Sequence, residues 1–304
     1  MYSGFSLRLA LASNATFSLC CALLMLFRPE LVGQWLGIDA PLTLQAIGVG
    51  LVLFAADLLH QITWQRIATW RALLTSVLDF SWVVGSFILI ALFPSLLSHT
   101  GKLIVAGVAD VVFGCCLWQL WAIARVHRTG KDGMYRHCVI VETNAPAEKM
   151  WQIVSNYGDI KNYMPSLKYS GVLDGKNLGV GAIRSCEDRS GKQWSEQCIA
   201  LNPGHSFAVR FLIEAANFSF PAKTMTGGWE VTATGTGSRV TVWWELTPKP
   251  VLLAPVILAV LGYQFDRDFP KVVKAMALSA LGHTPEVQTS VNSAVTARLI
   301  PSFC

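Results

Sequence analysis

The sequence predicts an α-helical membrane bundle followed by an α+β domain. Of its 304 residues 53% are hydrophobic and 14% are charged, and the mean hydropathy is +0.45, which is apolar for a protein that folds in water. Only five of the 24 Lys and Arg residues and five of the 19 Asp and Glu residues fall in the first 124 positions. From residue 135 the predicted order becomes strand, two helices, six strands and a long helix. We therefore expect a four-helix transmembrane domain at 1–125, an α+β domain at 135–283 and a disordered tail at 284–304.

The membrane prediction depends on four apolar stretches, at residues 7–27, 42–62, 72–93 and 103–123. Each is long enough to cross the hydrocarbon core, which needs about 20 residues. The first has no convincing cleavage site after its apolar run, so we interpret it as a retained span. Basic residues concentrate after the second and fourth spans: Arg66, Arg71, Arg125, Arg128, Lys131 and Arg136. The positive-inside rule then predicts cytoplasmic termini and a cytoplasmic α+β domain, in what we expect to be a bacterial inner membrane.

Three acidic residues, Asp57, Asp79 and Asp110, lie within the predicted spans. Charge in hydrocarbon is costly, so such residues usually face the interior of a bundle. With both termini inside, Asp57 and Asp79 lie about 8–12 Å from the inner boundary, at 1.5 Å per residue. They are therefore candidate neighbours, with His60 one turn from Asp57, whereas Asp110 falls in the outer half. Two interpretations stay open: a proton relay or polar ligand contact, and hydrogen bonding between helices.

The α+β part is predicted element by element. Pro146 early and Glu148 in the first turn mark a helix at 145–157, after a strand at 135–144. A second short helix is expected at 160–167. Gly, Asn and Asp turns separate the strands that follow, and a final helix runs from about 253 to 281. The expected strands are 168–173, 182–189, 193–200, 207–213, 224–234 and 239–247.

Several motifs in this part resemble one family. They are Val141-Glu-Thr-Asn-Ala-Pro-Ala-Glu-Lys-Met-Trp151, Tyr157-Gly-Asp-Ile-Lys-Asn-Tyr-Met-Pro165, Gly179-Val-Gly181, Ser195-Glu196 and Gly228-Trp229-Glu230-Val231. In order and spacing they resemble START-like (SRPBCC) domains of the polyketide cyclase/dehydrase and lipid-transport branch, over roughly half of the chain. The resemblance implies a helix-grip fold, in which a curved antiparallel sheet wraps a long C-terminal helix around an apolar cavity. It also implies binding of sterols, lipids, polyketides or other hydrophobic molecules, with a minority of members catalysing cyclisation or dehydration.

The strand residues suggest how such a cavity would be lined. Bulky aromatic residues recur along the strands, and we expect a void of a few hundred Å³ between sheet and helix. Simple core packing of the same aromatics is the alternative. We expect Ala208→Trp to fill the void. The predicted ligand contacts are Trp194, Phe211, Trp229, Trp243, Arg184 and Glu196.

Polar candidates in these strands are Arg184, Glu187, Glu196 and Arg210. Because strand side chains alternate, Arg184 shares a face with Cys186, and Glu196 shares one with Trp194. If both faces point inward, Arg184 and Glu196 pair at the cavity wall. An exposed cross-strand pair is equally compatible with the sequence.

The sequence leaves three functions open. The first is membrane-tethered binding, with transport as an extension, of a hydrophobic small molecule or lipid. The second is an enzyme of the cyclase/dehydratase type with Glu196 as general base and Arg184 stabilising an oxyanion. The third is a non-catalytic assembly or sensor protein. Metal and cofactor motifs are missing, and basic residues do not cluster, so we expect no metal, cofactor or nucleic-acid partner. The expected partners are the bilayer and the ligand; the cysteines are expected to be free thiols, and the oligomeric state stays open.

Overall fold

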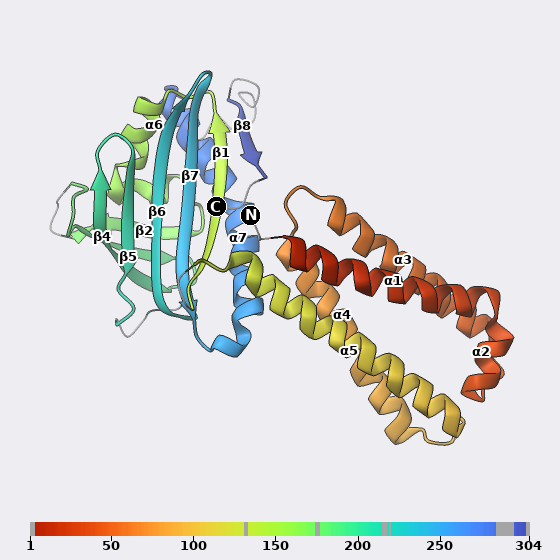
Figure 1. Cartoon of the computed structure of the whole chain (residues 1–304). Helices are drawn as coiled ribbons and strands as arrows, with labels where there is room; N and C mark the ends of the chain where they lie inside the picture. The colour runs from red at the N-terminus through yellow and green to blue at the C-terminus, as the bar shows by residue number, and fades with distance from the viewer. Residues whose placement is uncertain are drawn as a thin grey trace. The chain divides into compact units, whose positions relative to one another are not determined.

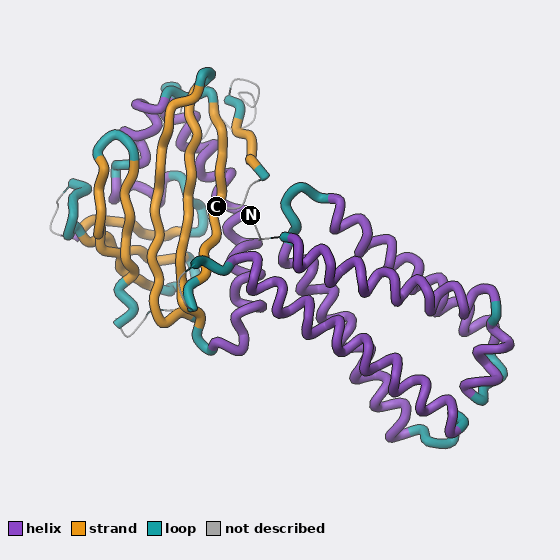
Figure 2. Tube along the Cα trace, in the orientation of Figure 1, coloured by secondary structure: helices purple, strands orange, loops and turns teal. Residues whose placement is uncertain are grey.

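The computed structural model describes residues 4–130, 133–173, 177–214, 218, 220–283 and 295–301. It divides into two compact units, Met1–Val126 and His127–Cys304. The first is helical and the second combines helices with a sheet (Figure 2). The predicted fold class, a four-helix membrane region followed by an α+β domain, is confirmed.

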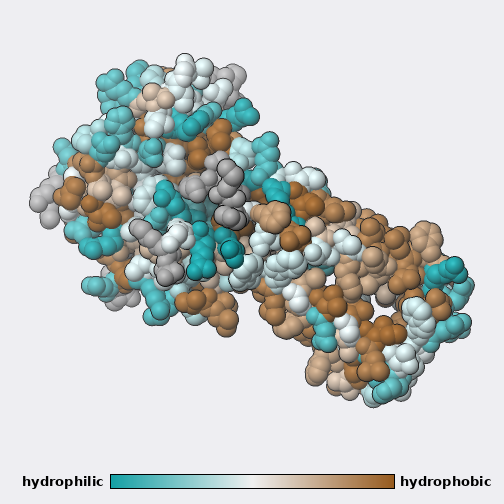
Figure 3. Space-filling view, viewed as in Figure 1, coloured by the Kyte–Doolittle hydropathy of each residue, from teal (hydrophilic) through white to brown (hydrophobic). Residues whose placement is uncertain are grey.

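The first unit contains four long helices and a short one. They are α1 (Phe5–Phe27), α2 (Pro29–Leu36), α3 (Pro41–Thr63), α4 (Thr69–Leu92) and α5 (His99–His127). The four long helices have 23 to 29 residues and are long and apolar enough to cross a membrane. At 1.5 Å per residue, 23 residues extend about 35 Å, more than the hydrocarbon core needs. Large apolar side chains such as Leu53 and Phe87 are exposed, and the visible face of these helices is mostly hydrophobic (Figure 3). Four helices able to span a membrane therefore lie where the sequence predicts spans.

Helix α2 was not predicted, because Arg28-Pro29-Glu30 reads as a break. The break ends α1 but also begins a new helix, since proline is well suited to a first helical position, where its missing N–H is not needed. Gly37 then ends α2 with a left-handed φ of 77°. Val32 and Leu36 of α2 are buried in an apolar cluster within this unit.

The second unit is an antiparallel sheet with a long helix along one face (Figure 1). Its strands are β1 (Tyr135–Thr143), β2 (Leu167–Val172), β3 (Ile183–Asp188), β4 (Gln193–Asn202), β5 (Ser206–Phe211), β6 (Ala222–Thr234), β7 (Gly237–Pro248) and β8 (Ala297–Ile300). In the described residues their order is β2-β3-β4-β5-β6-β7-β1-β8. The helical elements are α6 (Ala147–Val154), η1 (Tyr157–Asn162), η3 (Val251–Leu253) and α7 (Ala254–Ala280). This is the predicted helix-grip arrangement.

The C-terminal half of α7 packs on the sheet and forms the apolar core of the unit with it. Val272, Val273 and Met276 of α7 are buried in one apolar core with Val139 of β1 and Val242 of β7. Successive strand residues face opposite sides of a sheet, so every second residue of β1 and β7 reaches this core. The N-terminal half of α7 lies beside the cavity described below.

Three details differ from the sequence predictions. The short helix expected at 160–167 is instead the 3-10 turn η1, and Leu167 already begins β2. The tail expected to be disordered contributes β8, which pairs with β1 and covers its otherwise free edge; residues 284–294 and 302–304 of that tail lie outside the described residues. Cys138, expected to be a free thiol, is disulfide-bonded, and β8 runs along β1 towards it.

Candidate ligand-binding cavity

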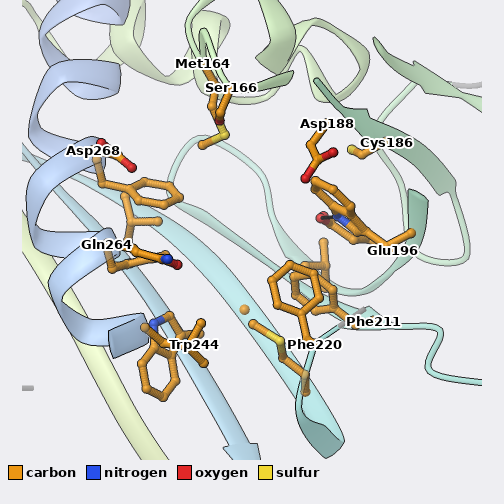
Figure 4. Close-up of a pocket in the computed structure, with 18 of the residues that line it drawn as sticks. Met164, Ser166, Cys186, Asp188, Glu196, Phe211, Phe220, Trp244, Gln264 and Asp268 are labelled. Atoms are coloured by element: carbon orange, nitrogen blue, oxygen red, sulfur yellow. Dashed lines mark hydrogen bonds between the residues drawn. The ribbon is translucent and has the colours of Figure 1, made fainter. Parts of the chain in front are cut away.

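A cavity of about 690 Å³ lies between the sheet and the N-terminal half of α7. Gln264 and Asp268 extend from α7 on one side, and Glu196, Phe211 and Phe220 lie across the space from them (Figure 4). The volume falls in the range of small-molecule sites, about 300–1,000 Å³. The cavity therefore occupies the position in which the sequence predicts one.

Strand alternation decides which side chains reach the cavity. On β5, Val209 and Phe211 face it, and on β6, Met225 and Trp229 face it, with Gly227 between them. A Cβ atom at Gly227 would lie 3.6 Å from the Phe211 ring and 3.9 Å from Val209. The nearest atom to that Cβ would be the Trp243 carbonyl oxygen at 3.3 Å, so glycine avoids a tight contact at this point of the wall.

Aromatic rings recur along the wall and pack against one another in edge-on or tilted pairs. Trp194 lies 5.6 Å from Phe220, and Phe220 lies 5.7 Å from Phe211, measured between ring centroids. On the α7 side, Phe269 lies 5.7 Å from Trp229. Such pairs hold rigid apolar surfaces in place, which suits a hydrophobic ligand.

Arg184 and Glu196 form a buried ion pair at the wall. They are direct cross-strand partners on β3 and β4, and both residues are 5% exposed. Arg184 Nη2 donates to Glu196 Oε2 at 2.5 Å, and Trp194 Nε1 donates to Glu196 Oε1 at 2.7 Å. Both carboxylate oxygens are therefore engaged. Of the two arrangements that the sequence left open, the structure shows the inward pair rather than the exposed one.

Tyr157, which sequence reasoning did not assign to the site, completes this polar group. Arg184 Nη1 donates to the Tyr157 carbonyl at 2.9 Å, and the guanidinium lies 4.3 Å from the Tyr157 ring centre. The Tyr157 hydroxyl donates in turn to the Glu196 backbone oxygen at 3.0 Å. Tyr157 belongs to η1, far from both strands in sequence, and the only available signal was its place in the family-like Tyr157–Pro165 motif.

Burial and charge set the protonation of this group. Burial, with a further contribution from Glu196, raises the pKa of the Tyr157 hydroxyl, so it stays protonated. Burial is the largest influence on Arg184 and opposes its charged form, but Glu196, Cys186 and Tyr157 together outweigh burial and raise the pKa of the guanidinium. Burial raises the pKa of the nearby Cys186 thiol to about 11, so this thiol is neutral near pH 7. The buried Arg184–Glu196 pair thus carries one positive and one negative charge, which cancel.

Other charged groups lie at the edge of the cavity or outside it. Arg267 and Asp268 pair with each other through contacts of 2.8 and 2.7 Å. Glu187 pairs with the exposed Lys168, which lowers the pKa of the Glu187 carboxyl. Arg210 donates to Gln197 on the exposed face. Of the four polar candidates in the sequence, only Arg184 and Glu196 enter the cavity.

The sequence predicts that the Trp243 side chain contacts the ligand, and Trp243 is among the residues that line the cavity. Trp243 borders the wall, but its ring lies on the outer face, where a Cβ at Gly228 would come within 2.5 Å of it. Arg136 stacks over that ring at 4.7 Å. The residue that points inward from this part of β7 is its neighbour Trp244, which is 2% exposed.

Ala208 faces outward for the same reason as Trp243. Its neighbours on β5, Phe207 and Val209, are buried inward, so Ala208 lies on the opposite face. The expectation that Ala208→Trp fills the void is therefore wrong, and Val209 is the matching inward position.

The intramembrane acids do not form the expected pair. Asp79 is buried and accepts from Asn14 Nδ2 at 2.8 Å and from Gln119 Nε2 at 3.0 Å, joining α4 to α1 and α5. Asp57 instead forms an ion pair with Arg71 and accepts from Gln61 at 2.7 Å. A hydrogen bond between helices, rather than a relay between two acids, describes what the structure shows.

The other two intramembrane candidates, His60 and Asp110, are exposed. His60 accepts from Trp64 Nε1 at 3.1 Å, and Asp110 lies on α5. Within the described residues, no group of three or more His, Cys, Asp or Glu side chains is arranged to hold a metal ion. The cavity of the α+β unit, larger than a hollow of about 370 Å³ lined by residues between Pro29 and Pro41, is therefore the candidate site.

The sequence profile described as polyketide cyclase/dehydrase and lipid transport matches residues 137–280, from β1 to the end of α7. No curated protein sequence matches the chain. The family match covers the same elements that enclose the cavity.

The solved structures that resemble part of this chain have low sequence identity to it. The Zhui aromatase/cyclase of Streptomyces sp. R1128 is 15% identical with a TM-score of 0.40, covering 49% of this chain and 98% of that one. Norcoclaurine synthase of Thalictrum flavum is 16% identical with a TM-score of 0.39, covering 52% and 95%. XoxI of Bacillus cereus is 16% identical with a TM-score of 0.37, covering 49% and 95%.

Proposed function

Since residues 137–280 form a domain of the polyketide cyclase/dehydrase and lipid transport family, we propose that this membrane-anchored chain binds an uncharged hydrophobic small molecule or lipid in its cavity. The observation that carries the proposal is a cavity of about 690 Å³ with a largely aromatic wall and a charge-balanced polar group. Tethering keeps the cavity close to a membrane, where poorly soluble molecules concentrate.

A purely structural role fits the cavity less well. Protein interiors are close-packed, and voids larger than a water molecule are few, because an unfilled apolar wall loses its dispersion contacts. A hollow of this size among Trp194, Phe211 and Trp229 would be refilled by small shifts of those rings if nothing else occupied it. An occupant of matching apolar character accounts for a wall that stays open.

A cyclase/dehydratase activity receives less support than binding. A general base must be available to accept a proton from the substrate. Glu196 instead accepts hydrogen bonds from Trp194 and Arg184 on its two oxygens, and Arg184 is further committed to Tyr157. Both groups are therefore engaged with each other rather than presented to a substrate.

Direct identification of the occupant tests the proposal. The full-length chain, purified in mild detergent, is extracted with organic solvent and the released molecules are identified by mass spectrometry. Val209→Trp should sharply reduce the recovered molecule because it fills the cavity, whereas Ala208→Trp, one residue away on the outer face, should leave it unchanged. Circular dichroism checks that both variants are folded. Equal recovery from both variants would refute binding in this cavity.

The charge balance of the wall predicts a preference among ligands. Arg184 is neutralised by Glu196 and Arg267 by Asp268, and the remaining lining cation, Lys192, is exposed to solvent near Asp188. A carboxylate ligand would therefore lose its water without gaining a buried, unpaired cation. At neutral pH, 2-naphthol should bind more tightly than 2-naphthoate, which has the same rings and a negative charge. Tighter binding of the carboxylate would contradict this argument.

We also propose that the α+β domain is cytoplasmic. The support is the distribution of Lys and Arg, which concentrate in the segments after α3 and α5. Reporter fusions at Thr69 and Gly130 should both report the cytoplasm, and a fusion at Leu97 should report the other side. An external location for Gly130 would overturn the orientation and would agree with the disulfide at Cys138, since such bonds are rare in a reducing compartment.

A further inference from the structure

Five aliphatic side chains are exposed together where α7 begins. They are Val251, Leu252, Leu253, Val256 and Val260, and we name them the mouth patch. Leu252 is 89% exposed and Val251 58%, although leucine and valine are among the residues most often buried. An exposed cluster of this kind marks a surface that contacts another apolar phase.

The mouth patch is continuous with the cavity. Val256 and Val260 are exposed to solvent and also line the cavity, as do their neighbours Ile257 and Leu261. The same stretch of helix therefore provides both the outer surface and part of the inner wall. A molecule leaving the cavity past these residues would emerge at the mouth patch.

The composition of this segment suits a bilayer surface. Residues 250–262 contain no charged or polar side chain, and at 13 residues the segment is too short to span the hydrocarbon core. Lys249 and Lys223 are exposed beside it, and a backbone hydrogen bond of 2.9 Å from Lys249 to Pro221 brings the two chain segments together. Aliphatic residues flanked by lysines match an interface with anionic headgroups.

The chain connection brings this surface within reach of a membrane. The second unit begins at His127, the last residue of α5, which is long and apolar enough to span. Within the second unit, the His127 ring lies beside α7, because a Cβ at Gly262 would be 3.6 Å from His127 Cε1. Gly262 follows Val260 by two residues, about 3 Å along the helix axis. The point at which the chain enters this unit is therefore next to the mouth patch.

We propose that the mouth patch docks on the bilayer surface, so that a hydrophobic ligand passes between lipid and cavity without crossing bulk water. The docking depends on the exposed side chains, the lysines and the chain connection. The passage of ligand additionally rests on the proposed function. The two parts can therefore fail separately.

Photo-crosslinking from the full-length chain tests the docking. The photoreactive residue p-benzoylphenylalanine replaces Leu252, and the protein is reconstituted in vesicles of phosphatidylcholine and phosphatidylglycerol. The control position is Thr236, which is exposed in the turn between β6 and β7. That turn is at the opposite end of β7 from the mouth patch, about 40 Å away along the strand. After illumination, mass spectrometry measures the lipid attached to each position.

We expect several-fold more lipid adduct at Leu252 than at Thr236, in wild-type and Val209→Trp backgrounds alike. Equal labelling at the two positions would overturn the docking, and so would adducts at Leu252 with a second protein copy in place of lipid. Lipid adducts at Leu252 without any molecule recovered from the cavity would leave the docking in place and refute the proposed function. A recovered ligand without lipid adducts would do the reverse.

Discussion

Removing one charge of the Arg184–Glu196 pair should destabilise the α+β unit strongly. Glu196→Gln keeps the shape of the side chain but leaves the Arg184 guanidinium charged and buried at 5% exposure. Breaking a buried pair from one side costs about 3–5 kcal/mol, because the remaining charge has lost its partner. For a unit of this size each kcal/mol lowers the melting temperature by about 2–4 °C, so a decrease of roughly 10 °C is expected.

Thermal unfolding of the full-length protein in detergent, followed by near-ultraviolet circular dichroism, measures this decrease. Glu187→Gln is the matched control, since Glu187 lies on the same strand as Arg184 and pairs with Lys168, which is 66% exposed. Exposed pairs contribute little to stability, so the control should melt close to wild type.

The double variant Arg184→Met/Glu196→Leu removes both charges of the pair, whereas Glu196→Gln removes only one and leaves the other buried without its partner. Replacing a whole buried pair with apolar side chains is often neutral or stabilising, so the double variant should recover most of the stability lost in Glu196→Gln. Two results would refute this reasoning. In the first, the melting temperature of Glu196→Gln equals or exceeds that of Glu187→Gln. In the second, the double variant melts at a lower temperature than Glu196→Gln.

Three further predictions concern other parts of the molecule. Asp79→Leu should lower thermal stability in detergent, because its two amide partners lose their acceptor at about 1 kcal/mol each, whereas Asp110→Leu at an exposed position should not; equal losses would contradict the buried network. Gly101→Ala should destabilise the bundle, since its Cβ would lie 2.4 Å from a backbone oxygen of α2, and Gly107→Ala on the same helix, with open space around it, should be tolerated; matching melting temperatures would count against this close contact. Cys186, with a thiol pKa of about 11, should resist alkylation at pH 8 in the folded protein and react once unfolded, because only about 0.1% is thiolate at that pH; rapid labelling of the folded form would exclude a buried thiol.

Local pattern alone determined much of the architecture. The four spans followed from apolar length, because the bilayer imposes one length on every spanning helix. The strands followed from alternation and turn residues. Alternation also placed Arg184 with Cys186 and Glu196 with Trp194 on common faces, and the structure turns both faces inward. Side-chain direction in a strand has a period of two, so relative facing within one strand is a local property.

Two features could be learned only from the tertiary structure: which face of a strand points into the cavity, and which residues distant in sequence are in contact. Trp243 and Trp244 are adjacent and chemically identical, so the sequence gives no basis for choosing which one points inward; only the position of α7 against β7 selects Trp244. Tyr157 reaches Arg184 because η1 folds back over β3, across 27 positions of sequence. Asp79 contacts Asn14 and Gln119 on two other helices. The sequence predicts how deep Asp79 lies in the membrane, but it does not predict which neighbouring helices the side chain faces.

The C-terminal tail and the cavity also show which features the sequence predicts and which depend on tertiary packing. Residues 297–300 have no strand pattern of their own, and they form β8 because the edge of β1 offers unpaired backbone groups. The aromatic composition of the strands predicted a cavity lining, but composition cannot say whether bulky rings fill a space or surround it. That depends on how far the sheet curves away from α7, which is a property of all the strands together. Sequence periodicity therefore determined the elements and their relative faces, and only the packing of the whole domain decided which residues meet.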